Sequence, residues 1–176
     1  ASLARRGWQV VVLDQAAAPA AGASALPAGV FAPHVSPDDS VLSRLSRSGV
    51  RTTLQQAGWL LNEGVDWSPC GVLEHRTDGT AGLPDGWANG PGAAWSQPAP
   101  PAALAQARLP PDTTACWHLQ AGWVRPARLA QALLAQPGIS WCPRKSVARL
   151  QRSPATSSAT TGDSAATGIW QALDDH

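Results

Sequence analysis

The sequence predicts an α/β fold, and three observations carry that prediction. Residues 10–13 are apolar and mostly β-branched, which is typical of a strand inside a sheet. Residues 37–61 carry apolar side chains at spacings of three to five, as an amphipathic helix does. Residues 1–7 end in Gly7, like a helix C-terminus, and lead directly into a strand at 8–13. A helix followed at once by a strand is the second half of a βαβ unit; its first strand and G-x-G-x-x-G loop are missing from this sequence.

The overall composition limits the classes of protein that the chain represents. The formal net charge is +1, so charge alone gives no general attraction to nucleic acid or to anionic membranes. No apolar run approaches the roughly 20 residues that span a bilayer, and we expect a cytoplasmic protein. Cys70, Cys116 and Cys142 are too few and too far apart for a disulfide framework or a zinc site, which fits a reducing cytosol and predicts no metal. The chain contains no methionine, so we expect a fragment of a longer protein.

The strand at 8–13 is followed by an acidic residue and a loop of small residues. In nucleotide-binding βαβ units, an acid at the end of the second strand accepts hydrogen bonds from the ribose hydroxyls of an adenosine, which makes Asp14 a candidate for that contact. Gly22 and Gly29 lie among small residues that let backbone N–H groups approach a ligand closely. The alternative is an ordinary strand, a surface acid and a flexible loop.

The long helix is predicted to span residues 37–61. Ser36 would be its N-cap and Pro37 its first residue, with an acid three positions after the serine. Gly49 and Gly58 would each weaken the helix by roughly 1 kcal/mol relative to alanine, so a helix that is broken at one of these glycines is the alternative. The stripe expected to be buried consists of Val41, Leu45, Val50, Leu54, Ala57 and Leu61.

Two sets of polar residues near this helix are open to two interpretations. Arg44, Arg47 and Arg51 share a helix face, which is either a strip that contacts RNA phosphates or an ordinary solvated face. His75 lies near the end of a strand predicted at 70–75 and is either catalytic or a surface histidine.

The rest of the chain alternates short strands and helices. A long connection rich in Gly, Pro and Ala at 77–101 precedes a short helix at 101–108. A strand at 114–119 is predicted to turn at 120–122 and to return at 123–124. Further predicted elements are a helix from Pro126 to about 137, strands at 139–142 and 146–151, a flexible hairpin loop at 153–168 and a return strand at 169–173.

Three segments carry a family resemblance. Residues 18–39 follow the pattern APA-x-GASGN-x-AG-x-F-x-P-x-x-S-x-DD, residues 121–134 (AGWVRPARLAQALL) follow GGW-x-x-P-x-x-L-x-x-ALL, and residues 70–73 read CGVL. In this order they resemble the glycine oxidase and D-amino-acid oxidase superfamily of flavoproteins. Ala25-Leu26 stand where the pattern has Gly-Asn, and Ala121 stands where it has Gly.

The resemblance implies a partial FAD-binding, Rossmann-like domain interleaved with a substrate domain on a mixed or antiparallel sheet. Residues 1–61 and 125–176 would belong to the FAD-binding domain, and residues 62–124 to the substrate domain. His34, just after the small-residue loop, is the candidate for contact with the substrate. The backbone of Val147 would contact the adenine, or Val147 is simply a core residue. The cofactor contacts implied are Asp14, Gln15, Gly22, Ala23, Ser24, Gly29 and Val147.

The superfamily members that this chain resembles most act on tRNA. That resemblance implies an FAD-dependent oxidoreductase that removes the carboxymethyl group from 5-carboxymethylaminomethyl-2-thiouridine at tRNA position 34, with a methyltransferase domain fused upstream. The flavin itself accepts the hydride in such chemistry, so the sequence needs no Ser-His-Asp set. One alternative is a stand-alone amine or amino-acid oxidase, which Ala25-Leu26 favours. The other is a truncated, non-catalytic domain. Without the phosphate-binding loop, we expect this fragment alone to bind FAD weakly and to be inactive.

Overall fold

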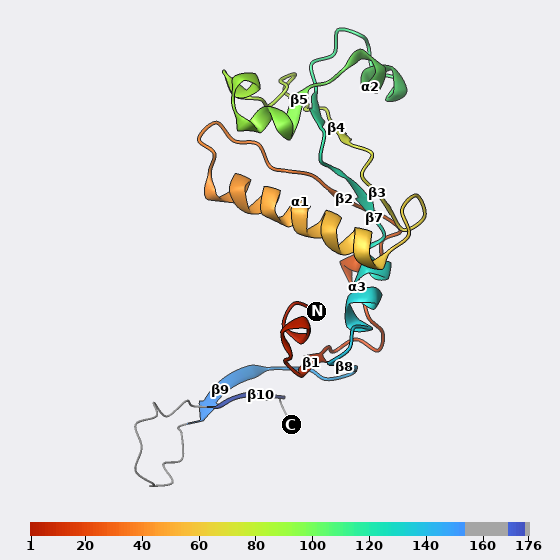
Figure 1. Cartoon of the computed structure of the whole chain (residues 1–176), viewed down its shortest axis with the longest axis vertical. Coiled ribbons are helices and arrows are strands. Elements are labelled where there is room, and N and C mark those ends of the chain that lie inside the picture. The colour runs from red at the N-terminus through yellow and green to blue at the C-terminus, as the bar shows by residue number, and fades with distance from the viewer. Residues whose placement is uncertain (154–168, 175–176) are drawn as a thin grey trace. The chain divides into compact units, whose positions relative to one another are not determined.

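The computed structural model describes residues 1–153 and 169–174, which divide into two compact units (Figure 1). Unit 1 is discontinuous and combines Ala1–Gly22 with the chain from Leu133 onward. Unit 2 is the continuous segment Ala23–Ala132. These boundaries differ from those predicted at 61/62 and 124/125. The assignment of segments to FAD binding and to substrate binding stays a prediction.

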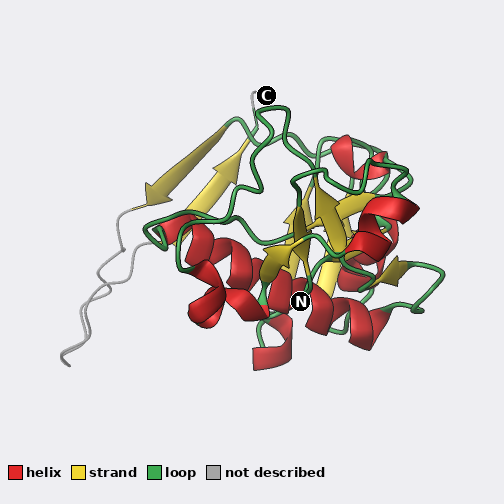
Figure 2. Cartoon of the chain, turned by 90° about the horizontal axis from the view of Figure 1, so that it is seen from above, coloured by secondary structure: helices red, strands yellow, loops and turns green. Residues whose placement is uncertain are grey.

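Unit 1 is built on two pairs of strands. Strands β1 (Val10–Leu13) and β8 (Ile139–Cys142) pair in parallel. Strands β9 (Arg149–Ser153) and β10 (Ile169–Leu173) pair antiparallel, and Figure 2 shows them as a ribbon of two opposed arrows. The 3-10 helix η1 (Ala4–Arg6) ends at Gly7, whose φ of 85° lets its N–H reach the Ala4 carbonyl oxygen. The α/β fold class is thereby confirmed. The predicted helical segment ending at Gly7 and the strand after it are also present, although the strand begins at Val10 rather than at residue 8.

Three details of unit 1 differ from the prediction. Alternate side chains of β1 are exposed, Val11 by 61% and Leu13 by 41%, and its other face is only half-buried. The strand predicted at 146–151 begins three residues later, which leaves Val147 before β9. The loop predicted at 153–168 lies outside the described residues except for Ser153, which ends β9.

Unit 2 contains two antiparallel sheets of three strands each. In the first sheet, β7 (Gly122–Val124) lies between β2 (Gly29–Phe31) and β3 (Trp67–Ser68). In the second, β6 (Cys116–His118) lies between β4 (Val72–Glu74) and β5 (Ser96–Pro98). The predicted return at 120–124 is therefore wrong, because β6 and β7 belong to different sheets. The Gly71 N–H donates to the Ala121 carbonyl oxygen at 2.9 Å, so the chain between β6 and β7 runs on beside the chain between β3 and β4.

Helix α1 (Val41–Leu60) begins four residues later than predicted. Its N-cap is Ser40, whose side chain accepts a hydrogen bond from the Ser43 N–H. Ser36 instead supports this cap, because its Oγ accepts a hydrogen bond from the Ser40 N–H at 3.0 Å. Residues 37–39 cannot belong to the helix because Asp39 has a left-handed φ of 47°.

The C-terminal half of α1 packs on the first sheet, along which the helix runs in Figure 1. Ala57 joins Trp67 and Val124 in the core cluster, and Phe31, Leu54, Leu61 and Leu129 pack against it. The predicted stripe is correct at Val50, Leu54, Ala57 and Leu61. It is wrong at Val41 and Leu45, which are 61% and 63% exposed. The helix is unbroken through Gly49 and Gly58, since packing outweighs their low propensity.

The other helices are short. Helix α2 (Pro101–Gln106) and helix α3 (Pro126–Leu134) confirm the predicted helices, each shorter than expected. The long connection before α2 contains β5 and two 3-10 helices, η3 (Trp87–Asn89) and η4 (Pro91–Ala94). A further 3-10 helix, η2 (Ala23–Ala25), lies in the small-residue loop. In the described part of the chain, none of the helices is long and apolar enough to cross a bilayer.

Candidate functional site

The carboxyl ends of β1 and β8 form one edge, where backbone hydrogen bonds join the following loops. The Lys145 N–H donates to the Asp14 carbonyl oxygen at 2.9 Å, and the Arg144 N–H donates to that of Ala16 at 3.1 Å. The half-buried Asp14 carboxylate accepts the Ala16 N–H through Oδ1 at 2.9 Å. Among the described residues, Oδ2 has no hydrogen-bond partner. Ligands of open α/β sheets bind beyond the carboxyl ends of parallel strands, and Asp14 directly follows β1 at that end.

Two further predicted contact residues lie at the same edge. Gln15 is exposed beside Asp14, and Val147 follows Lys145 by two residues and is 43% exposed. The next residue is held in place, because the Ala148 N–H donates to the Leu173 carbonyl oxygen at 2.8 Å. Asp14 and Gln15 are thus adjacent at this edge, and Val147 lies two residues beyond Lys145, whose N–H donates to Asp14. Their contact with a cofactor stays a prediction, and the exposure of Val147 argues against the core alternative.

The glycines of the small-residue loop differ in their surroundings. A Cβ atom at Gly22 would meet no atom within 4 Å, and Ala23 and Ser24 are exposed beside it. A Cβ atom at Gly29 would lie 3.1 Å from Cγ of Pro126. The absence of a side chain at Gly29 is therefore explained by close packing of β2 against the start of α3. Gly22, Ala23 and Ser24 therefore have the open surroundings that the approach of a ligand requires, and Gly29 does not.

The two candidate histidines are both exposed. The His34 backbone N–H donates to Ser46 Oγ in α1 at 2.8 Å, which fixes the chain but leaves the imidazole in solvent. Substrate contact by His34 stays a prediction. His75 follows β4 rather than lying within it, and its exposure favours the surface interpretation.

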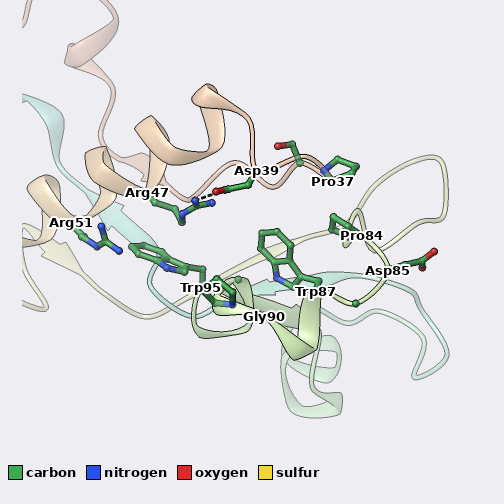
Figure 3. Close-up of a pocket in the computed structure, with 13 residues that line it drawn as sticks. Pro37, Asp39, Arg47, Arg51, Pro84, Asp85, Trp87, Gly90 and Trp95 are labelled. Carbon is green, nitrogen blue, oxygen red and sulfur yellow. Dashed lines mark hydrogen bonds and ion pairs between the residues drawn. The ribbon is translucent and has the colours of Figure 1, made fainter.

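A cleft of about 410 Å³ lies within unit 2, between the first half of α1 and residues 84–95 (Figure 3). The turn before α1 contributes Asp39, the helix contributes Arg47 and Arg51, and the opposite wall contains Trp87 and Trp95. The sequence analysis did not identify this cleft. Its one signal was the pair of tryptophans inside a long connection of small residues, a kind of segment that is commonly functional.

Each of the two arginines in the cleft has a side-chain partner. Arg47 forms an ion pair with Asp39, and the guanidinium of Arg51 lies 4.7 Å from the ring centroid of Trp95, as in a cation–π contact. Arg44 is exposed on the same helix and does not line the cleft. The predicted strip of three arginines is therefore divided, with two members facing the cleft and one facing solvent.

A buried polar cluster links the three strands of the second sheet, and the sequence analysis missed it. His118 Nδ1 lies 2.8 Å from Ser96 Oγ, and His118 Nε2 lies 2.9 Å from Glu74 Oε2. Arg76 Nε donates to the other carboxylate oxygen of Glu74 at 2.8 Å. The only signal in the sequence is a histidine in a strand-like run, because its partners lie 22 and 44 residues away.

This cluster has the residue types of a hydrolase triad but not the access. Ser96 is fully buried and His118 is 1% exposed, so no substrate reaches the hydroxyl. Burial raises the pKa of the neighbouring Cys116 thiol to about 11, which keeps it protonated. We conclude that the cluster stabilises the sheet. The described residues contain no group of three or more His, Cys, Asp or Glu side chains placed to hold a metal ion.

Comparison with known proteins gives a consistent result. A family model described as FAD dependent oxidoreductase matches residues 1–174. The chain is 64% identical, over 99% of its length, to the tRNA 5-methylaminomethyl-2-thiouridine biosynthesis bifunctional protein MnmC of Verminephrobacter eiseniae. Proteins with the same name from Paracidovorax citrulli and Delftia acidovorans are 65% and 57% identical over 91% and 99% of the chain. The chain covers only 27%, 26% and 27% of these three relatives.

Proposed function

Because this chain belongs to the FAD-dependent oxidoreductase family, we propose that it is part of a flavoenzyme that oxidises a secondary amine in tRNA. The observation that carries the proposal is the combination of the family match over residues 1–174 with 64% identity to a relative named for tRNA thiouridine biosynthesis. The proposed reaction removes the carboxymethyl group from 5-carboxymethylaminomethyl-2-thiouridine at position 34. The proposed setting is the cytoplasm, in a longer protein that also carries a methyltransferase domain. The relatives' description as bifunctional supports a second activity.

The residues at the carboxyl end of β1 fit the adenosine part of FAD. The Asp14 carboxylate keeps one oxygen without a hydrogen bond from any described residue, which suits a ribose hydroxyl as donor. Val147 is exposed at the same edge and can present its backbone to an adenine. The open surroundings of Gly22 suit close approach of a ligand to the backbone there, and contact of Ala23 and Ser24 with the cofactor stays a prediction. When bound, FAD supplies the acceptor for the hydride that leaves the carbon beside the amine nitrogen.

The cofactor assignment is tested in the intact natural protein by measuring FAD affinity. Asp14→Ala removes a charged hydrogen-bond acceptor, so we expect FAD to bind about 10- to 100-fold more weakly. Asp112→Ala, which removes an exposed acid in a loop of unit 2, is the control and should bind FAD like the wild type. Unchanged FAD affinity in Asp14→Ala would refute the role given to Asp14. Colourless wild-type protein that cannot be reconstituted with FAD would refute the proposal of an FAD-dependent enzyme and would support a non-catalytic module.

The substrate is tested by product analysis. We expect the intact protein to convert the carboxymethylaminomethyl nucleoside of tRNA, as measured by chromatography and mass spectrometry of digested tRNA. The alternative is a stand-alone amine oxidase, which the replacement of Gly-Asn by Ala25-Leu26 favours. Ala25 and Leu26 are both exposed in the loop after Gly22. Turnover of free glycine or sarcosine without turnover of tRNA would establish that alternative.

A further inference from the structure

The cleft of unit 2 has the chemistry of a site for an unpaired nucleotide. Its volume of about 410 Å³ lies within the roughly 300–1,000 Å³ that is usual for small-molecule sites. We propose that this cleft binds one unpaired nucleotide of the RNA substrate, with the base stacked on Trp87 and the phosphate near Arg51. The inference rests on the proposed function for the RNA substrate and adds the surface that recognises it.

Trp87 is held as a fixed platform. Its indole Nε1 donates to the Ser96 carbonyl oxygen at 2.9 Å, which sets the orientation of the ring. The ring also lies directly against the backbone of Gly92, where a Cβ atom would come within 2.4 Å of it. The half-buried ring lines the cleft, and in Figure 3 it points across it toward Asp39 and Pro37. A ring that is already immobile loses little entropy when a base stacks on it.

Arg51 supplies a positive charge that no acid neutralises. Among the described residues, no carboxylate forms an ion pair with Arg51, whereas Arg47 is paired with Asp39. Contact with the Trp95 ring, itself only 6% exposed, holds the Arg51 guanidinium at one end of the cleft. Figure 3 places the acidic Asp85 at the opposite end. The cleft therefore has a cationic end for a phosphate, whereas the Asp85 carboxylate at the other end points away from Trp87.

The shape and the charge favour a single-stranded segment over a duplex. Proteins read unpaired RNA by stacking splayed bases on aromatic rings and arginine planes, and a base within a duplex is not available for this. The net charge of +1 provides little general attraction to a duplex backbone, so local contacts have to supply the affinity. The wobble nucleotide and its neighbours lie in the single-stranded anticodon loop, which presents such bases.

The experiment uses the intact natural protein loaded with FAD and measures binding by fluorescence anisotropy. The probe is a synthetic RNA stem–loop with a tRNA anticodon loop and an unmodified uridine at the wobble position. The second probe is the same stem as a blunt duplex without the loop. We expect Trp87→Ala to weaken stem–loop binding by about 5- to 150-fold, the range found for loss of one stacked base. Trp87→Phe should retain most of the affinity, because a phenyl ring still stacks. Duplex binding should not change.

Arg51 is tested with a matched arginine on the same helix. Arg51→Gln should weaken stem–loop binding and lower the slope of log Kd against log salt by about 0.7, which corresponds to one phosphate contact on a single strand. Arg44→Gln removes the same charge outside the cleft and should leave both values unchanged.

The results separate this inference from the proposed function. Wild-type affinity for the stem–loop in both Trp87→Ala and Arg51→Gln, with an intact flavin spectrum, overturns the cleft as the RNA site and leaves the proposed function standing. Equal losses in Arg44→Gln and Arg51→Gln also overturn it, because they indicate general electrostatics. Absence of stem–loop binding by the wild type overturns both. If Trp87→Ala does not fold, the comparison of Arg51→Gln with Arg44→Gln decides, because both arginines are exposed on α1 and only Arg51 lines the cleft.

Discussion

His118 Nε2 lies 2.9 Å from Glu74 Oε2, and this contact joins the central strand of the second sheet to one of its neighbours. The other ring nitrogen reaches Ser96 on the opposite neighbour, so one imidazole connects β4, β5 and β6. Each strand in this sheet is only three residues long. Strands this short form few backbone hydrogen bonds, and we infer that the side-chain network contributes a large share of the sheet's stability.

Removal of the Ser96 hydroxyl should destabilise the protein. Ser96→Ala leaves His118 Nδ1 without its hydroxyl partner in a fully buried position, so we expect the free energy of unfolding to fall by about 1–3 kcal/mol. Denaturant unfolding measures this change. Ser48→Ala, on the exposed face of α1, should change the same quantity by less than about 0.5 kcal/mol. Equal effects of the two substitutions would show that the cluster contributes nothing.

The same cluster should make stability depend on pH in the acid range. Burial raises the pKa of Glu74, but the hydrogen bonds and positive charges of His118 and Arg76 together outweigh it, so the pKa falls below its ordinary 4.5. A carboxylate whose pKa is lower in the folded state stabilises the protein above the unfolded value and loses that contribution as the pH falls through the folded value. Between neutral pH and pH values below 4.5, the wild type should therefore lose more free energy of unfolding than Glu74→Gln. Glu63→Gln, an exposed control, should follow the wild-type curve.

The three thiols should differ strongly in reactivity. Cys116 is 1% exposed, and burial raises its pKa to about 11, so at pH 8 roughly one molecule in a thousand carries the thiolate even before access is considered. Cys70 is exposed and should react first with iodoacetamide, as mass spectrometry of peptides would show. Cys70→Ser should remove the fastest phase. Labelling of Cys116 in the native protein at the rate of Cys70 would contradict the burial described here.

Two glycine-to-alanine substitutions should have opposite effects. A Cβ atom at Gly122 would lie 1.9 Å from the carbonyl oxygen of Ser68, a backbone atom of the paired strand β3 that cannot move aside. Gly122→Ala should therefore lower the free energy of unfolding by at least about 3 kcal/mol. A Cβ atom at Gly49 would meet no atom within 4 Å inside α1, so Gly49→Ala should raise it by about 0.5–1 kcal/mol. Denaturant unfolding of both variants tests the pair, and a destabilised Gly49→Ala would show that α1 needs flexibility there.

Local sequence patterns predicted most individual elements of this fold. The helix of α1 follows from its apolar spacing, and α3 follows from Pro126 and the leucines after it. The sequence alone could not predict the first residue of α1, because serine is a good N-cap and both Ser36 and Ser40 precede the helix. The choice between them depends on the left-handed turn at Asp39.

Long-range pairing was the part that local patterns missed. The strands at 10–13 and 139–142 were each predicted, but nothing in either indicates that they pair in parallel. The hairpin predicted at 114–124 was wrong for the same reason. A turn between two short strands can join them in a hairpin or lead the chain into another sheet, and local sequence does not distinguish the two. Asp14 was identified as a candidate by its place directly after the strand at 8–13, and the family resemblance supported it. The cleft and the His118 cluster consist of residues that are distant in sequence and meet only after folding.

The pairing of β1 with β8 also sets an order for biosynthesis. Val10 is made before Ala23–Ala132, whereas its partner Ile139 is made only after the whole of that segment. The inserted segment is continuous and has its own core, so it can begin to fold before Ile139 is made. Folding of this segment shortens the flexible part of the chain between β1 and β8. The entropy lost when these two strands pair is therefore smaller. Mutations that slow folding of the inserted segment should therefore delay the pairing of β1 with β8.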